Sequence, residues 1–152
     1  MAVFEHEQTL PCDVERVFDF LTRPANVVRL SLPENELIFL AAPDVLTAGA
    51  ELEFEIRAYG QRQSVVHEIV ELDRPRRVLE RMVHGPLEDW EHEHLFERSS
   101  EGARIVDRIT FEPPRGLIGL LLTEQRIMSS LERGFAHQRR LLEEFAARGE
   151  LA

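Results

Sequence analysis

The sequence predicts an α+β domain in which an antiparallel sheet packs against one long C-terminal helix. Two observations carry this prediction. Alternating apolar and polar residues mark about seven strands, and apolar residues from 117 to 145 recur at the three-then-four spacing of one helix face. The helical patterns follow the first strand and end the chain instead of alternating with strands, which is typical of α+β folds.

The composition is that of one globular domain covering residues 1–152. With 43% hydrophobic and 30% charged residues, the chain is ordinary for a globular protein with a single core. Its net charge of −10 argues against binding to nucleic acid or to an anionic membrane surface. No apolar run is long enough to span a membrane, and residues 1–8 lack a signal-peptide pattern, so we expect a cytoplasmic location. One cysteine, Cys12, excludes an intrachain disulfide and a four-cysteine zinc site.

The first part of the chain is predicted to form a strand and two short helices. Residues 3–10 have a mixed alternation and form the expected first strand. The apolar positions of 14–21 predict a short amphipathic helix, whose start carries two carboxylates that favour a helix N-terminus. Pro24 suits the first turn of a second helix, which Pro33 ends at the latest.

Six further strands are expected, separated by turns rich in glycine, proline and aspartate. Alternation is cleanest in 51–59, where apolar residues occupy one face and mostly charged residues the other, as in a sheet with one buried face. Residues 99–102 read as a hairpin loop. The expected strands cover residues 37–40, 51–59, 64–72, 77–84, 90–98 and 103–112.

The longest predicted element is a helix over residues 118–148, which would span roughly 45 Å. Glu124 and Gln138 interrupt its apolar face, and Gly134 on that face would let another element approach closely. A strongly bent sheet that wraps this helix leaves a concave, mainly apolar space, where small molecules typically bind.

Two stretches resemble a known family. They read G-P-x-x-x-W-x-H-x-H-x-F-E at residues 85–97 and D-x-I-x-F-x-x-P-x-G at residues 107–116. They look like the polyketide cyclase/dehydrase-like, ligand-binding branch of the START/Bet v 1-like (SRPBCC) superfamily. The resemblance covers nearly the whole chain and implies a helix-grip fold, in which a seven-stranded sheet curls around the C-terminal helix and encloses a cavity. It does not specify an activity, because the superfamily includes lipid carriers, hormone receptors and aromatase/cyclases.

One histidine and one aspartate are predicted to pair inside the sheet. Period-two geometry places His92 and His94 on one strand face, and large aromatic residues at both ends of that face mark it as the inner one. If residues 99–102 form a simple hairpin, His94 lies opposite Asp107 and within side-chain contact distance. We therefore expect a partly buried His94–Asp107 hydrogen bond, with His92 one step along the strand.

Other polar residues are candidates for the same inner face. His67 shares a face with apolar residues of its strand. Glu80 points inward in one register of strand 77–84 and outward in the other, and the sequence leaves both registers open. Glu124 lies on the apolar face of the long helix.

Several interpretations of these residues are compatible with the sequence. A His–Asp pair can satisfy its own hydrogen bonds and fix the strand register, leaving a module whose cavity its own side chains fill. It can orient a mostly apolar ligand. It can also act in a cyclase/dehydratase-type enzyme, with His94 as the catalytic acid or base and Asp107 orienting it.

A metal site is a further alternative. His92 and His94 direct two imidazoles to one side, and Asp107 or Glu80 could supply a third ligand for zinc or a similar ion. Asp107 could equally orient the histidines from outside. Two histidines without a fixed third ligand are a weak signal, and the resemblance implies no metal, so we assign no metal ligand and expect no cofactor.

The favoured function is the binding of a hydrophobic or amphipathic small molecule between the sheet and the long helix. We expect no nucleic-acid or membrane partner, and the chain could be a monomer or a homodimer. The predicted lining combines apolar and polar side chains, namely Phe54, Ile56, His67, Met82, Trp90, His92, His94, Asp107, Phe111, Ile127, Met128, Leu131 and Phe135.

Overall fold

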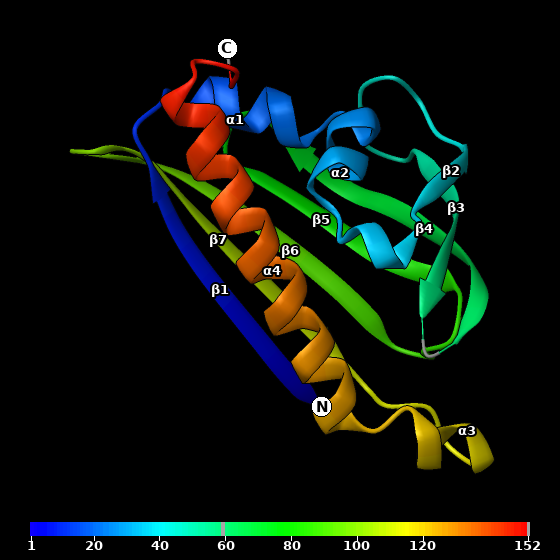
Figure 1. The fold of residues 1–152 in the computed structure, drawn as a ribbon. Coiled ribbons are helices and arrows are strands. Elements are labelled where there is room, and N and C mark those ends of the chain that lie inside the picture. The colour runs from blue at the N-terminus through cyan, green and yellow to red at the C-terminus, as the bar shows by residue number, and fades with distance from the viewer. Residues whose placement is uncertain (59, 152) are drawn as a thin grey trace.

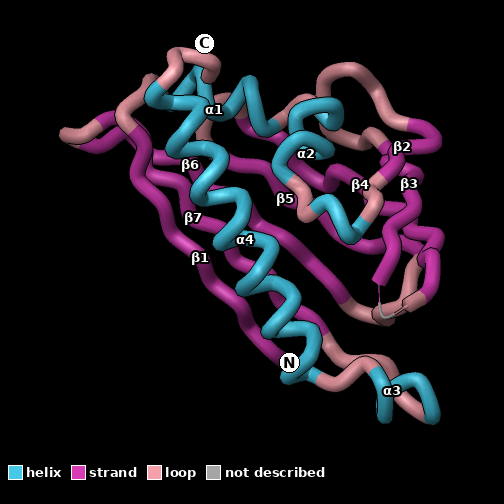
Figure 2. Tube along the Cα trace, in the orientation of Figure 1, coloured by secondary structure: helices cyan, strands magenta, loops and turns pink. Residues whose placement is uncertain are grey.

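A seven-stranded antiparallel sheet curls around a long C-terminal helix in the computed structural model, which describes residues 1–58 and 60–151 (Figures 1 and 2). The strand order is β1-β7-β6-β5-β4-β3-β2, so β1 and β2 are the edges. The strands are β1 (Ala2–Leu10), β2 (Ile38–Ala41), β3 (Glu51–Ala58), β4 (Gln61–Asp73), β5 (Arg77–His84), β6 (Trp90–Ser99) and β7 (Gly102–Phe111).

On the concave side of this sheet lie α1 (Val14–Leu21), α2 (Pro24–Leu30) and the long helix α4 (Glu124–Ala147) (Figure 1). The short helices α1 and α2 follow β1 and lie near the C-terminal end of α4. A 3₁₀ turn forms at Pro33–Asn35, and the short helix α3 (Leu117–Leu121), which precedes α4, projects beyond the sheet. The predicted α+β class and helix-grip arrangement are confirmed. Among the described residues, no helix is long and apolar enough to cross a membrane.

The predicted strands all form, with small differences at their ends. Tyr59, the last residue expected in the third strand, lies outside the described residues. The open register of β5 is settled by burial, because Val78 is only 3% exposed whereas Val83 is 50% exposed. Glu80, which shares a face with Val78, therefore points inward.

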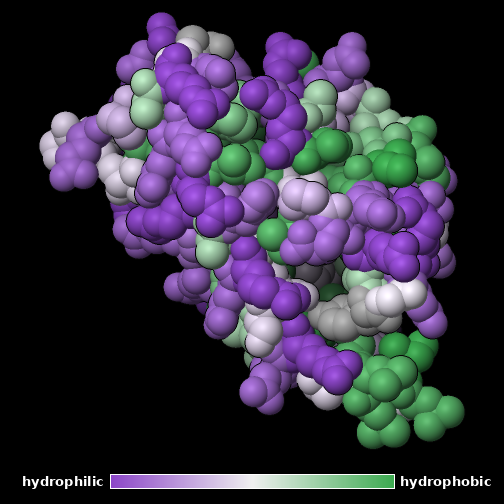
Figure 3. Space-filling model, in the orientation of Figure 1, coloured by the Kyte–Doolittle hydropathy of each residue, from purple (hydrophilic) through white to green (hydrophobic). Residues whose placement is uncertain are grey.

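The predicted helix over 118–148 is wrong at its N-terminal end. The side chain of Thr123 accepts a hydrogen bond from the backbone N–H of Arg126 at 3.3 Å, so the long helix begins with a new N-cap there. The preceding apolar residues form the separate helix α3, which the space-filling view shows as an exposed hydrophobic tip (Figure 3). Glu124 is exposed instead of inward-facing, and a Cβ at Gly134 would meet nothing within 4 Å, so no element approaches closely there.

The hydrophobic core consists of two clusters along the inner face of the sheet. The larger one lies beneath α1, α2 and the C-terminal end of α4, and includes Phe18, Ile105 and Leu142. The smaller one joins the N-terminal half of α4 to β1 and β7, and includes Phe111 and Ile127. One helix therefore packs on both clusters.

Hydrogen bonds also attach α4 to the edge strand β1. The side-chain amide of Gln8, which is 2% exposed, donates to the carbonyl oxygen of Arg139 at 2.9 Å. The guanidinium of Arg139 in turn donates to the carbonyl oxygen of Glu7 at 2.7 Å. These bonds fix the position of α4 along the sheet.

Replacing Leu142 by alanine should lower the free energy of unfolding by roughly 2–5 kcal/mol, because it removes buried apolar surface and leaves a cavity. The Leu142 side chain is 0% exposed, whereas Leu117 in α3 is 83% exposed. Leu117→Ala is therefore the matched control and should change the free energy by less than about 0.5 kcal/mol. Urea unfolding followed by circular dichroism measures both variants, and equal effects would contradict this packing of α4.

Candidate functional site

A belt of polar side chains crosses the inner face of the sheet. Alternation along each strand places these residues between apolar neighbours, so the belt runs between the two hydrophobic clusters. Five adjacent strands contribute to it. The polar belt consists of His6 from β1, Asp107 from β7, His92 and His94 from β6, Glu80 from β5 and His67 from β4.

Asp107 is the centre of the polar belt and is only 2% exposed. Its Oδ1 accepts a hydrogen bond from Nε2 of His92 at 2.8 Å and lies 3.0 Å from Nδ1 of His94. His94 is directly opposite Asp107 in the β6–β7 ladder, as the hairpin led us to expect. Sequence reasoning missed the second bond, from His92, which brings the two imidazole rings into a stack with centroids 3.6 Å apart.

Glu80 continues the belt toward β4. Its Oε1 lies 3.0 Å from Nδ1 of His67, and its Oε2 lies 3.7 Å from Nε2 of His94. The rings of Phe54 and Trp90 pack against His67, with centroids 4.9 and 4.7 Å away. Nε2 of His67 is buried and has no hydrogen-bond partner among the described residues. His67 is therefore joined to the rest of the belt through Glu80.

The electrostatics of the belt follow from burial and from these short contacts. Burial lowers the pKa of His94, but Asp107 and Glu80 outweigh it and raise that pKa to about 9. Burial disfavours ionisation of both carboxylates, yet hydrogen bonds from the histidines hold the pKa of Asp107 and of Glu80 below the usual range. Burial and the neighbouring His94 lower the pKa of His92. Asp107 and Glu80 therefore favour the protonated form of His94, which lies between them.

A partly enclosed cavity of about 150 Å³ borders the belt beneath α1 and α2. Glu80, His92, His94 and Asp107 form its polar side, together with Gln138 from α4. The remaining walls are mostly apolar. They are formed by Leu21, Thr22, Pro24, Val27, Phe39, Leu46, Leu52, Val78, Phe96 and Phe135.

Only part of the predicted lining borders this cavity, namely His92, His94, Asp107 and Phe135. The N-terminal half of α4 packs directly on the sheet, where the rings of Phe4 and Phe135 lie 5.3 Å apart, and this contact closes the space expected there. The other predicted residues therefore lie in or against the hydrophobic clusters, except His67, which contacts Glu80. They are Phe54, Ile56, His67, Met82, Trp90, Phe111, Ile127, Met128 and Leu131.

Many of the walls that sequence reasoning missed come from α1, α2, β2 and the loop after β2, and the others are Leu52, Val78, Glu80, Phe96 and Gln138. Val27 and Leu46 are examples, and both are half-buried. Their apolar character was visible in the sequence, but their position over the belt depends on how two short helices dock on the sheet.

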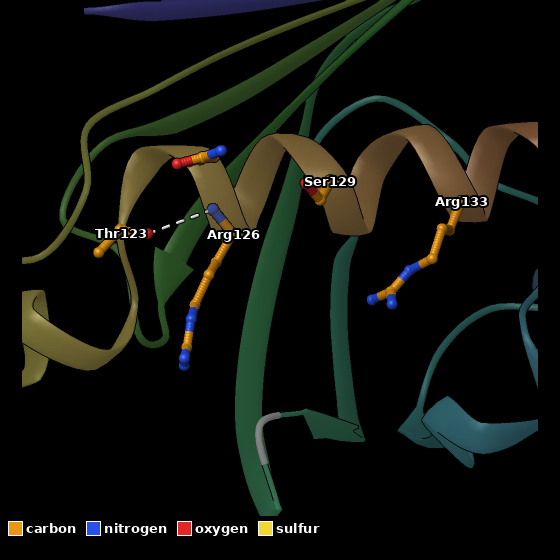
Figure 4. A pocket seen from close by; sticks show the side chains of 5 residues that line it. Thr123, Arg126, Ser129 and Arg133 are labelled. Atoms are coloured by element: carbon orange, nitrogen blue, oxygen red, sulfur yellow. Dashed lines mark hydrogen bonds between the residues drawn. The ribbon is translucent and has the colours of Figure 1, made fainter.

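A second hollow lies along the outside of α4 and is open to solvent, with a volume of about 490 Å³. Its lining comes from α4 and its N-cap, and the side chains of Arg126 and Arg133 extend from the same side of the helix (Figure 4). No residue of the polar belt borders it. It is a surface groove, whereas the smaller cavity brings side chains from many elements together, so the cavity is the candidate site.

Replacing Asp107 by alanine should lower the free energy of unfolding by roughly 3–5 kcal/mol, because the change leaves buried charged partners without their counter-charge. Asp44→Ala, at an exposed position in the loop after β2, is the control and should have little effect. Urea unfolding of both variants provides the measurement. A loss below about 1 kcal/mol for Asp107→Ala would show that the belt does not depend on this carboxylate.

Comparisons with known proteins agree with this architecture. A family model described as polyketide cyclase / dehydrase and lipid transport matches residues 1–143. No curated protein matches the chain in sequence.

Solved structures of the same fold cover almost the whole chain. The protein TTHA0849 from Thermus thermophilus is 19% identical with a TM-score of 0.76, covering 97% of this chain and 99% of that one. Ara h 8.0201 is 15% identical with a TM-score of 0.68, covering 97% and 98%. A protein from Arthrobacter aurescens is 16% identical with a TM-score of 0.72, covering 93% and 86%. These identities support the fold alone, but the family match spans most of the sequence, and this chain therefore belongs to the polyketide cyclase/dehydrase and lipid transport family.

Proposed function

We propose that this protein binds a compact hydrophobic or amphipathic small molecule in the cavity between the sheet and its covering helices. The observation that carries the proposal is the division of the cavity into apolar walls and one polar side. A few convergent polar groups in a mainly apolar pocket are typical of ligand sites. The family and the fold are consistent with the binding of a hydrophobic ligand.

The size of the cavity restricts the ligand. Its volume of about 150 Å³ is below the roughly 300–1,000 Å³ of pockets that hold drug-sized molecules. An apolar cavity of about 150 Å³ in another protein takes up benzene. The proposed ligand therefore has an apolar body of about one ring.

The polar side of the cavity selects for a ligand that also carries a polar group. Gln138 can donate and accept hydrogen bonds, and His94 and Glu80 offer further donors and acceptors. A purely apolar ligand would displace water from these groups without replacing its hydrogen bonds, which costs free energy. A carbonyl or hydroxyl group on the ligand avoids this cost and fixes its orientation.

Catalysis of the cyclase/dehydratase kind is a second candidate function. The observation that favours it is the position of His94 on the cavity wall, with Asp107 Oδ1 3.0 Å from its Nδ1. A histidine oriented by a carboxylate can transfer a proton to or from a bound molecule. His94→Gln keeps a hydrogen-bonding side chain but cannot transfer a proton, so an enzyme would lose turnover whereas a binding protein would lose only part of its affinity.

Native mass spectrometry of gently purified protein, beside the mass after denaturation, tests for a ligand that the protein carries from its host. An organic adduct that is lost on denaturation is the expected result. Incubating the released ligand with fresh protein and examining the recovered molecule by chromatography and NMR then separates the two candidate functions. An enzyme changes the structure of the ligand, with or without loss of water, whereas a binding protein returns it unchanged.

Replacing Val27 by tryptophan should fill the cavity and weaken binding of p-cresol, a one-ring phenol, by roughly tenfold or more, which is about 1.4 kcal/mol. Val28→Trp is the matched control on the same helix, because Val28 is exposed and does not line the cavity. Ligand-observed NMR titrations measure both affinities. Equal affinities in the two variants, or no binding to the wild-type protein together with no native adduct, would contradict the proposal.

A further inference from the structure

We propose that Glu80, His92 and His94 form a binding site for one divalent transition-metal ion at the wall of the cavity. One ligand atom from each residue lies within 4.8 Å of the other two. Two imidazole nitrogens and a carboxylate oxygen are a common donor set for zinc and for ferrous iron. This inference goes beyond the proposed function, because binding of an organic molecule requires no metal.

The sheet holds the three donors on rigid neighbouring strands. Glu80 on β5 is directly opposite His92 on β6, and His94 is the next residue along β6 that faces inward. All three residues border the cavity. The arrangement therefore does not depend on a flexible loop, and strand pairing already determines which side chains converge.

The spacing between His94 and Glu80 suits an intervening ion. Nε2 of His94 and Oε2 of Glu80 are 3.7 Å apart, which is longer than the roughly 2.7–3.2 Å of a direct hydrogen bond. Two ligands that are each about 2.0–2.2 Å from a tetrahedral ion are about 3.4 Å apart. The two atoms would therefore move together by less to bind a common metal ion than to form a direct hydrogen bond with each other.

A residue outside the trio contacts one possible donor atom of each member. Oδ1 of Asp107 contacts Nε2 of His92 and Nδ1 of His94. The other ring nitrogens, Nδ1 of His92 and Nε2 of His94, are therefore the ones that could bind an ion. Nδ1 of His67 contacts Oε1 of Glu80, so Oε2 of Glu80 is the oxygen that could bind an ion. Carboxylates that orient metal-binding histidines from behind are a regular feature of zinc sites.

Charge also favours a cation at this point. Nδ1 of His94 faces Oδ1 of Asp107, and its Nε2 faces Oε2 of Glu80. Two carboxylates on either side of one imidazole in a buried site favour a positive charge between them. A divalent ion would supply that charge.

The trio supplies three protein ligands, and the adjoining cavity gives access to the remaining coordination positions. Sites that keep an open position are typical of metals that bind water or a substrate. If the cavity takes a ligand as proposed above, its carbonyl or hydroxyl oxygen can occupy that position. This second step rests on the proposed function, whereas the metal site itself does not.

Titration of the chelator-treated protein with cobalt(II), followed by visible absorption, tests the site. We expect d–d bands that saturate at one equivalent and disappear when zinc(II) is added. Isothermal titration with zinc(II) then gives the affinity, and a zinc-dependent rise in melting temperature provides an independent measure. Absence of both the cobalt bands and the zinc heat would overturn the proposal.

Variants identify the ligands. Glu80→Gln and His92→Gln should each weaken zinc binding by roughly 100-fold or more, since outer partners alone contribute about 10–100-fold. Glu91→Gln and His84→Gln are the matched controls at exposed positions and should leave the affinity within about twofold. Equal affinities in trio and control variants would place the metal elsewhere and overturn the proposal.

Two further readouts keep the outcomes distinct. Circular dichroism establishes that each variant is folded. If Glu80→Gln unfolds, the zinc affinity of His92→Gln alone tests whether the trio binds the metal. Binding of p-cresol without zinc binding would refute the metal site alone. Zinc binding without p-cresol binding would support the metal site and count against the proposed organic ligand.

Discussion

The buried carboxylate of Asp107 imposes the strictest requirement on this fold. An ionised side chain that is 2% exposed persists only if charged or hydrogen-bonding partners surround it, and His92 and His94 are those partners. They can reach it only in one register of the β6–β7 hairpin, in which Ser99 pairs with Gly102. A slip of one residue would turn both histidines to solvent and leave Asp107 unpaired. Strand register and site geometry therefore have the same cause.

The same requirement explains where the cavity lies. Apolar side chains of α4 pack closely on each of the two hydrophobic clusters, but between them the helix passes over the polar belt. There it presents Gln138 instead of an apolar residue. Polar groups must keep hydrogen-bond geometry and cannot interdigitate as freely as methyl groups, so this section of the interface is left incompletely filled. Docking of α1 and α2 then turns the gap into a cavity with apolar walls.

Features that depend on local periodicity could be predicted from the sequence, whereas features that depend on docking could not. The hairpin loop was sufficient to place His94 opposite Asp107, because register follows from loop length. The start of α4 was misplaced because the apolar spacing continues through the Thr123 cap and α3. The register of β5 was ambiguous because both of its faces carry apolar residues, and burial of Val78 decided it. The bond from His92 to Asp107 depends on side-chain directions that a period-two pattern does not specify.

A belt of this kind couples the stability of the fold to what occupies the site. Glu80 and Asp107 bring two carboxylates into the interior, and His94, whose pKa both of them raise, contacts both. A divalent ion bound to the trio would supply positive charge to the same two carboxylates without altering the strand register. Because a ligand that binds only the folded state stabilises it by mass action, occupancy would then raise the stability of the fold. These charges help to fix the strand register, but well-packed hydrophobic residues could replace them at little cost in stability. The position of Glu80, His94 and Asp107 on the wall of a cavity therefore supports the proposal of a bound partner.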